Sequence, residues 1–321
     1  MLLLLLGLGL CAGFAVPIQT AINSKLSLYT RSPFYAATIS FGTGTIGLLL
    51  INIVFYPKLF NVIFSSQIQY TWFLGGMMGV IFLSGNLLLL LRIGASLTVV
   101  TTVSGQIAMS VVIDTLGLFN VSNQPFSTLK GIGLLLLLLG VVLMNLNRQS
   151  LLDKQRSSRT TFWLCIGVIL GCAPPIQTAI NTQLSQSIHS PLFASFISFL
   201  VGTLVLIIIT SIIHRKFRIY VYHDIHGPIR WWHFIGGMLG VIFVTANIIL
   251  TPHLGVAYTI IIVMIGQIIM GLIIDHFGLL GLPSIKISHQ RLLGFALIIV
   301  AIIMIQLSWR TMILQTTQND I

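Results

Sequence analysis

Ten apolar runs, each close to twenty residues long, recur along this 321-residue chain and constrain its fold more than any other feature. Each run is long enough to cross roughly 30 Å of hydrocarbon as a helix. A backbone inside lipid must satisfy its own hydrogen bonds, so such runs form helices. The sequence therefore predicts an all-α integral membrane protein with ten transmembrane helices. The predicted spans are 2–22, 34–55, 71–91, 95–113, 128–146, 161–181, 192–213, 232–250, 256–274 and 291–309.

The charge content excludes a water-soluble domain. Only 7% of the residues are charged and the mean hydropathy is +1.03, whereas a soluble domain carries about 25% charged residues. The net charge of +11 does not indicate nucleic acid as a partner, because the basic residues lie mainly between apolar runs, where they set membrane topology. Neither metal-ligand spacing nor a nucleotide-binding motif is visible, so we expect no metal, no cofactor and no enzymatic activity.

The chain repeats itself once. The segment PIQTAIN occupies 17–23 and again 175–181, an offset of 158, and beyond a loop the matches continue at an offset of 161. We therefore expect a first five-helix repeat at 1–147, a basic linker at 148–160 and a second five-helix repeat at 161–321. The matched positions include Pro33 with Pro191, Ser40 with Ser198, Gly75 with Gly236, Asn86 with Asn247, Gln106 with Gln267, Asp114 with Asp275, and Gly133 with Gly294.

An odd number of spans in each half predicts that the two halves have opposite orientations in the membrane. The loops on one side of the predicted topology hold 13 Lys and Arg residues, and the loops on the other side hold 3. Basic loops stay on the cytoplasmic side, so the count predicts both termini outside. The three outside residues are Lys58, Lys130 and Arg310. Inverted repeats of this kind are the plan of many secondary transporters.

These motifs resemble the YdcZ-like family of inner-membrane exporters, within the drug/metabolite transporter superfamily. The resemblance rests on Pro17-x-Gln19-x-x-x-Asn23, Ser32-Pro33, Ser40-Phe41-x-x-Gly44-Thr45, Gly105-Gln106 and Asp114, and on their second copies, so it covers nearly the whole chain. It implies a bacterial plasma-membrane location and a ten-helix fold with a central cavity. Other ten-helix members of the superfamily are described with both termini in the cytoplasm, whereas the charges here predict both outside.

Two amide pairs are the first candidates for a solute site. Gln19 and Asn23 are four residues apart, so they share one helix face, and Gln177 and Asn181 repeat the arrangement. Polar side chains in a span face the bundle interior or a water-filled path, which favours lining of a central site. The alternative is that the amides only hold helices together. Further substrate-binding candidates, each matched between the halves, are Asn86, Asn247, Gln106 and Gln267.

Two matched prolines lie one turn or more before the asparagines of these pairs. Pro17 and Pro175 each remove one helical hydrogen bond and free a carbonyl. In transporters such helix breaks often mark the binding region. A packing kink without a role in binding is an equally good interpretation.

Two aspartates are the proton-coupling candidates. Asp114 and Asp275 lie at the ends of apolar spans in equivalent positions, and the chain contains no glutamate. An acid near a span is a candidate proton or cation site. Its place near an interface, however, favours a structural anchor at a helix end.

The sequence thus predicts a secondary transporter that exports a small metabolite or drug-like molecule by alternating access. Its expected partners are that small-molecule substrate and the lipid bilayer. One chain holds both halves, so a monomer is a sufficient unit, with a dimer as the alternative. The rival interpretation is a non-transporting membrane scaffold or assembly subunit, in which the polar pairs are interhelical contacts only.

Overall fold

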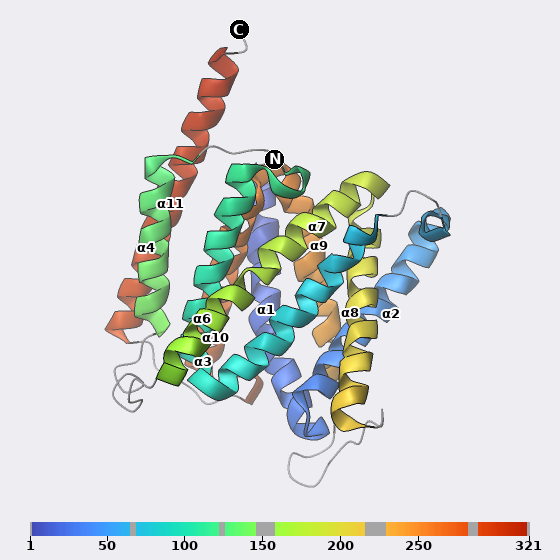
Figure 1. Ribbon diagram of the computed structural model, residues 1–321. Helices are drawn as coiled ribbons and strands as arrows, with labels where there is room; N and C mark the ends of the chain where they lie inside the picture. The colour runs from blue at the N-terminus through green and yellow to red at the C-terminus, as the bar shows by residue number, and fades with distance from the viewer. Residues whose placement is uncertain are drawn as a thin grey trace.

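The computed structural model describes residues 2–64, 69–121, 126–145, 158–215, 229–281 and 288–319. Ten α-helices account for most of these residues and pack into one bundle (Figure 1). Their bounds are α1 Leu2–Thr30, α2 Pro33–Phe55, α3 Leu74–Leu116, α4 Thr128–Asn145, α6 Ser158–Gly171, α7 Ala173–Ile188, α8 Pro191–His214, α9 Gly236–Leu254, α10 Val256–Phe277 and α11 His289–Asn319. The prediction of an all-helical chain is confirmed for the described residues.

The helix boundaries differ from the predicted spans at several places, and the ends of α7 at Ile188 and of α11 at Asn319 lie beyond the predicted ends at 181 and 309. The third and fourth predicted spans join into the single helix α3. The sixth span is divided at Cys172 into α6 and α7. The first helix continues to Thr30, well past its predicted end at residue 22. Most of the predicted linker, residues 148–157, lies outside the described residues.

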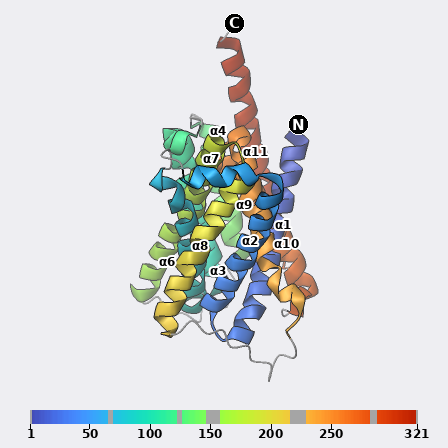
Figure 2. The same cartoon turned by 90° about the vertical axis from the view of Figure 1, so that its right-hand side faces the viewer.

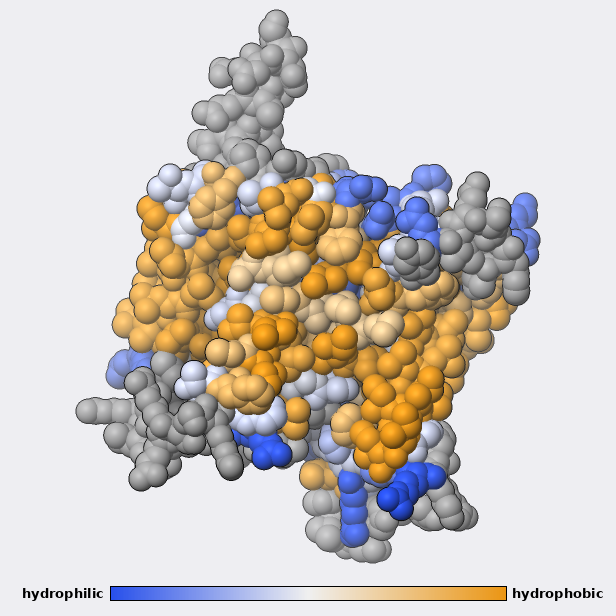
Figure 3. All heavy atoms as spheres, viewed as in Figure 1, coloured by the Kyte–Doolittle hydropathy of each residue, from blue (hydrophilic) through white to orange (hydrophobic). Residues whose placement is uncertain are grey.

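Among the described residues, seven helices are long and apolar enough to cross a membrane, and two shorter apolar helices accompany them. Figure 3 shows hydrophobic residues covering the middle of one face, with hydrophilic residues gathered towards its upper and lower ends. This is the surface of a protein whose sides contact lipid and whose ends contact water. The seven spans are Leu2–Thr30, Pro33–Phe55, Leu97–Leu116, Thr160–Ile188, Pro191–His214, Trp231–Leu254 and Val256–Ile274, and the shorter helices are Thr128–Leu143 and His289–Ile305.

The sequence repeat is reproduced in the backbone. Ser32 and Ser190 cap α2 and α8, each hydroxyl accepting a hydrogen bond from the backbone N–H three residues on, and each is followed by a proline at the first helical position. The residues before them, Arg31 and His189, both adopt left-handed backbone conformations, with φ of 49° and 53°. Local sequence therefore builds the same helix–turn–helix corner twice.

The two halves meet first through α2 and α8, which lie side by side (Figures 1 and 2). Phe41 and Phe199 are equivalent residues, and their ring centroids are 5.1 Å apart. One turn on, the equivalent hydroxyls of Thr45 and Thr203 are 2.8 Å apart. Residues at matched positions of the sequence repeat therefore contact each other between these two helices.

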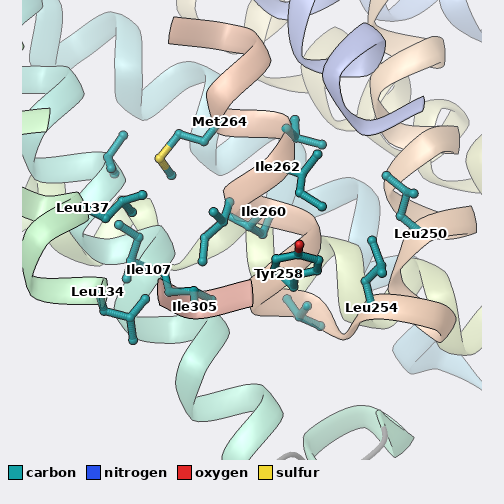
Figure 4. Close-up of a cluster of buried hydrophobic side chains, with 14 of the residues drawn as sticks. Ile107, Leu134, Leu137, Leu250, Leu254, Tyr258, Ile260, Ile262, Met264 and Ile305 are labelled. Carbon is teal, nitrogen blue, oxygen red and sulfur yellow. The ribbon is translucent and has the colours of Figure 1, made fainter. Parts of the chain in front are cut away.

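A second contact between the halves lies between α4 and α11. Gly133 approaches the backbone carbonyl of Ala301, and Gly140 approaches that of Gly294, so these two contacts are also matched at the offset of 161. The glycines let the two backbones come close, as is common where membrane helices pack. Beside this contact, buried apolar side chains of α3, α4, α9, α10 and α11 form one cluster, including Ile107, Leu137 and Ile305 (Figure 4).

Candidate functional site

The first helix of each half packs mainly against the opposite half. α1 lies against α9 and α10, whereas α6 and α7 lie against α3. Glycines mark both crossings: Gly13 meets Gly266, and Gly171 meets Gly105. A Cβ atom at any of the four would collide with backbone of the facing helix. Each crossing thus depends on glycine and positions the amide pair that follows it on α1 or α7.

Each amide pair reaches a serine on the neighbouring helix of its own half. On α7, Asn181 donates from Nδ2 to the Ser198 hydroxyl at 3.1 Å, and Gln177 donates from Nε2 to the same oxygen at 3.4 Å. On α1, Asn23 donates from Nδ2 to Ser40 Oγ at 3.1 Å. Ser40 and Ser198 were not among the predicted site residues. Their signal was present, however, because both stand at the offset of 158.

The amides also lie against the glycine-rich face of the opposite half. A Cβ on Gly240 would come within 2.8 Å of Gln19 Nε2, and one on Gly79 within 2.7 Å of Gln177 Nε2. Gly236 and Gly75 are similarly placed against the Oδ1 atoms of the matched asparagines. The two clusters, here called the amide clusters, therefore sit at the contact between the halves: Gln19, Asn23, Ser40, Gly236 and Gly240 form one, and Gln177, Asn181, Ser198, Gly75 and Gly79 form the other.

The amide clusters combine packing with unused hydrogen-bonding capacity. The Oδ1 atoms of Asn23 and Asn181 are buried and accept no hydrogen bond within the described part of the chain. Burial of an unpaired carbonyl is unfavourable in lipid or protein interior. The amides therefore hold helices together through their NH₂ groups. Their Oδ1 atoms are left over as acceptors, and a wider spacing of the helices would make them available to a solute or to water.

The two clusters differ in burial. Asn181 is fully buried and Gln177 is 9% exposed, whereas their equivalents Asn23 and Gln19 are only partly buried. The same holds for the next pair of candidates, because Asn247 is 2% exposed and Asn86 is partly buried. Asn247 donates to the Phe243 carbonyl of its own helix at 3.0 Å.

The remaining candidate amides lie beside the helix crossings. Gln106 of α3 and Gln267 of α10 directly follow the crossing glycines Gly105 and Gly266 in the chain, and both are partly buried. The structure therefore places these glutamines beside the contacts between α3 and α6 and between α1 and α10.

The prolines occupy different environments. The predicted helix break at Pro17 is not seen, since α1 continues through this residue without interruption. A proline removes a single hydrogen bond, and long helices can absorb that loss. Pro175 lies in the first turn of α7, just after the interruption at Cys172, where a missing N–H costs nothing.

Asp114 joins the two halves at the end of α3. Its two carboxylate oxygens accept hydrogen bonds from the backbone N–H groups of Val256 and Ala257, both at 2.8 Å. These are the first residues of α10, so the carboxylate satisfies N–H groups that have no partner within the helix and meets the positive end of its dipole. Asp114 is 1% exposed, and the buried Lys130 lies within electrostatic range. The side chain of the equivalent Asp275 lies outside the described residues.

No group of three or more His, Cys, Asp or Glu suited to a metal ion occurs in the described ranges. Lys130 was not among the predicted site residues, although it is matched by Arg291 at the offset of 161. The polar groups that do converge are neutral amides and hydroxyls at the amide clusters, and one carboxylate at a helix end. Such an arrangement can form and exchange hydrogen bonds between helices.

Comparison with known proteins agrees with this arrangement of apolar helices. The sequence matches the family described as "Putative inner membrane exporter, YdcZ" over residues 4–143 and again over residues 162–304. The chain belongs to this family. It is a multi-pass protein of the bacterial inner membrane, and its family is one of exporters rather than enzymes.

Two individual proteins are similar to this member of the YdcZ family. The inner membrane protein YdcZ of Escherichia coli (strain K12) is 29% identical over 116 residues, which are 36% of this chain and 76% of that protein. The relative is thus about half as long as this chain. A crystal structure of a protein with 15% sequence identity matches with a TM-score of 0.57, covering 93% of this chain and 98% of the other, which shows a shared fold.

Proposed function

We propose that this protein is a secondary transporter that exports a small metabolite or drug-like molecule by alternating access. Its two five-helix halves, 1–147 and 161–321, form inverted repeats, and the amide clusters line the path where the halves meet. Two related bundles of opposite orientation can form two near-equivalent states that face opposite sides of the membrane. The matched contacts across the molecule carry this proposal.

The direction of the helices supports the inversion. In Figure 1, α1 descends from the end that holds both chain termini, whereas α6 and α7 ascend towards it. Equivalent helices therefore run in opposite senses through the apolar band. The two glycine crossings are also equivalent, because Gly13 corresponds to Gly171 and Gly266 corresponds to Gly105 in the sequence repeat. The basic loops assign the end without termini to the cytoplasm.

The rival function, a membrane scaffold, predicts that the amides serve packing alone. The contacts between asparagine and serine are compatible with it. The unequal burial of the two amide clusters favours transport, because a static scaffold has no need to bury equivalent residues differently. Proton coupling through Asp114 or Asp275 remains a prediction, and the backbone contacts of Asp114 favour an anchoring role for it.

Solute release from proteoliposomes tests the proposed function. Vesicles containing the protein and protein-free vesicles are loaded with a small-molecule extract of the expressing cells, and proton gradients of both signs are applied. Mass spectrometry of the external medium should show one or a few solutes released faster by the protein.

The Gln19→Ala/Gln177→Ala double variant should release those solutes at least tenfold more slowly, because it removes one amide from each cluster. Ser187→Ala is the control, since Ser187 is exposed on α7 and its hydroxyl donates to the Gln183 carbonyl of its own helix. Equal release from protein-containing and empty vesicles under every gradient would favour the scaffold.

A further inference from the structure

We infer that this conformation is open on one side only, through a half-pathway lined by Thr20 and Ser24 of α1. In the opposite conformation, the equivalent residues Thr178 and Thr182 of α7 line the other half-pathway. This inference rests on the proposed function. It goes beyond that function because it says to which side the present conformation is open and names pathway residues outside the amide clusters.

The unequal exposure of these hydroxyl residues is the first observation. Thr20 and Ser24 are both exposed, although they lie one residue beyond Gln19 and Asn23 on a helix that packs against three others. Their equivalents Thr178 and Thr182 are only 6% and 2% exposed. The segments around these positions are nearly identical, PIQTAINSKL at 17–26 and PIQTAINTQL at 175–184, so the difference in exposure reflects how the halves are arranged.

The packing of α1 and α7 explains this difference. α7 packs against α9 and α10 of its own half, in addition to α3 of the other half. The equivalent contact would bring α1 against α3, and among the described residues no comparable contact between them exists. Because α1 ends at the lower end of Figure 1 and α7 at the upper end, these extra contacts of α7 hold the upper end together, and their counterparts are missing at the lower end among the described residues.

A second asymmetry lies at the closed end. Gly255, with φ of 79°, separates α9 from α10, and Asp114 holds the free N-terminus of α10. The equivalent Gly94 lies inside the continuous helix α3. The described backbone therefore differs between the halves at these two equivalent glycines.

The open half-pathway brings solvent to hydrogen-bonding groups. Thr20 and Ser24 are four residues apart and share one face of α1, next to the amides of Gln19 and Asn23. The ammonium group of Lys25, the residue after Ser24, lies 5.4 Å from the centre of the Trp232 ring. A solute entering here meets hydroxyls and amides first.

Labelling of single cysteines with a membrane-impermeant maleimide tests the inference. In full-length protein whose Cys11, Cys165 and Cys172 are replaced by serine, the variants Thr20→Cys, Ser24→Cys, Thr178→Cys and Thr182→Cys are compared in native membranes. We expect the two α1 cysteines to react at least tenfold faster than the two α7 cysteines, and only from the side that bears Arg31.

Ile46→Cys is the matched control for exposure to lipid. Ile46 is 59% exposed on α2. A cysteine there faces lipid and not water, so it should not react with a water-soluble maleimide. Reaction at residues 20 and 24 but not 46 supports a hydrated half-pathway. Failure at all three, or equal reaction of the α1 and α7 cysteines, overturns the inference. Solute release from proteoliposomes is measured separately, so transport without this labelling pattern would refute the assigned state and leave the proposed function standing.

Discussion

Replacement of Asp114 by alanine is expected to destabilise the folded protein by about 3–5 kcal/mol, the range for removing one partner of a buried charged contact. Two N–H groups at the start of α10 lose their acceptors, and they are buried, so water does not replace the carboxylate. The loss also removes the carboxylate that interacts electrostatically with Lys130 in the described part of the chain. The measurement is thermal unfolding of the purified protein in detergent, with the apparent Tm falling markedly below that of the wild type.

The isosteric variant Asp114→Asn separates anchoring from charge. Its amide oxygen can still accept one backbone hydrogen bond, so its Tm should lie between those of the wild type and the alanine variant. Because the contact joins α3 to α10 at the closed end, both variants should also raise the maleimide reactivity of Thr178→Cys. An alanine variant with wild-type Tm and a protected residue 178 contradicts the anchoring role.

Replacement of Gly13 by alanine is expected to destabilise the bundle by about 1–3 kcal/mol, and leucine by more, because added atoms overpack a close contact. A Cβ on Gly13 would collide with the Val263 carbonyl and lie 2.7 Å from Gly266 Cα. All these atoms belong to backbone, so no flexible side chain can yield. Gly171→Ala should have a comparable effect, since its Cβ would meet the Thr102 backbone in the same way.

Gly42→Ala is the control for the glycine series. A Cβ on Gly42 would meet nothing within 4 Å, although Gly42 lies inside the helix α2 just as Gly13 lies inside α1. Alanine has the better helix propensity by about 1 kcal/mol, so this variant should keep or raise the Tm. If Gly13→Ala and Gly42→Ala have the same Tm, the crossing of α1 and α10 does not depend on close backbone contact.

The lengths of the apolar runs predicted the helices well, because a helix must have a certain length to cross the membrane. It predicted the boundaries less well at residues 94 and 172. The break after α6 does have a local signal, since Pro174 and Pro175 follow it closely and lack backbone N–H groups. The continuity of α3 through residue 94 depends instead on packing. The extension of α1 to Thr30 has a similar cause, because polar residues continue a helix when α2, α9 and the Trp231–Phe234 turn (η4) cover it.

The site was predictable as a set of positions but not as a set of contacts. The offset of 158 identified Gln19, Asn23, Gln177 and Asn181 as equivalent, and the structure places each pair in an equivalent cluster. Sequence could not show that the two clusters are buried unequally, since equivalent residues have equivalent neighbours in the chain. The partner of Asp114 was also hidden, because backbone N–H groups of residues 256 and 257 carry no residue-type signal.

The opposite orientation of the two halves is tested most directly by the sidedness of Arg31 and His189. They are equivalent residues, both exposed, and both stand in the same left-handed corner before α2 or α8. Arg31→Cys and His189→Cys in the cysteine-free protein are treated with an impermeant maleimide in right-side-out and inverted membrane vesicles. We expect residue 31 to react only in inverted vesicles and residue 189 only in right-side-out vesicles. Reaction of both residues from the same side of the membrane would contradict the inverted repeat and, with it, the proposed transport cycle.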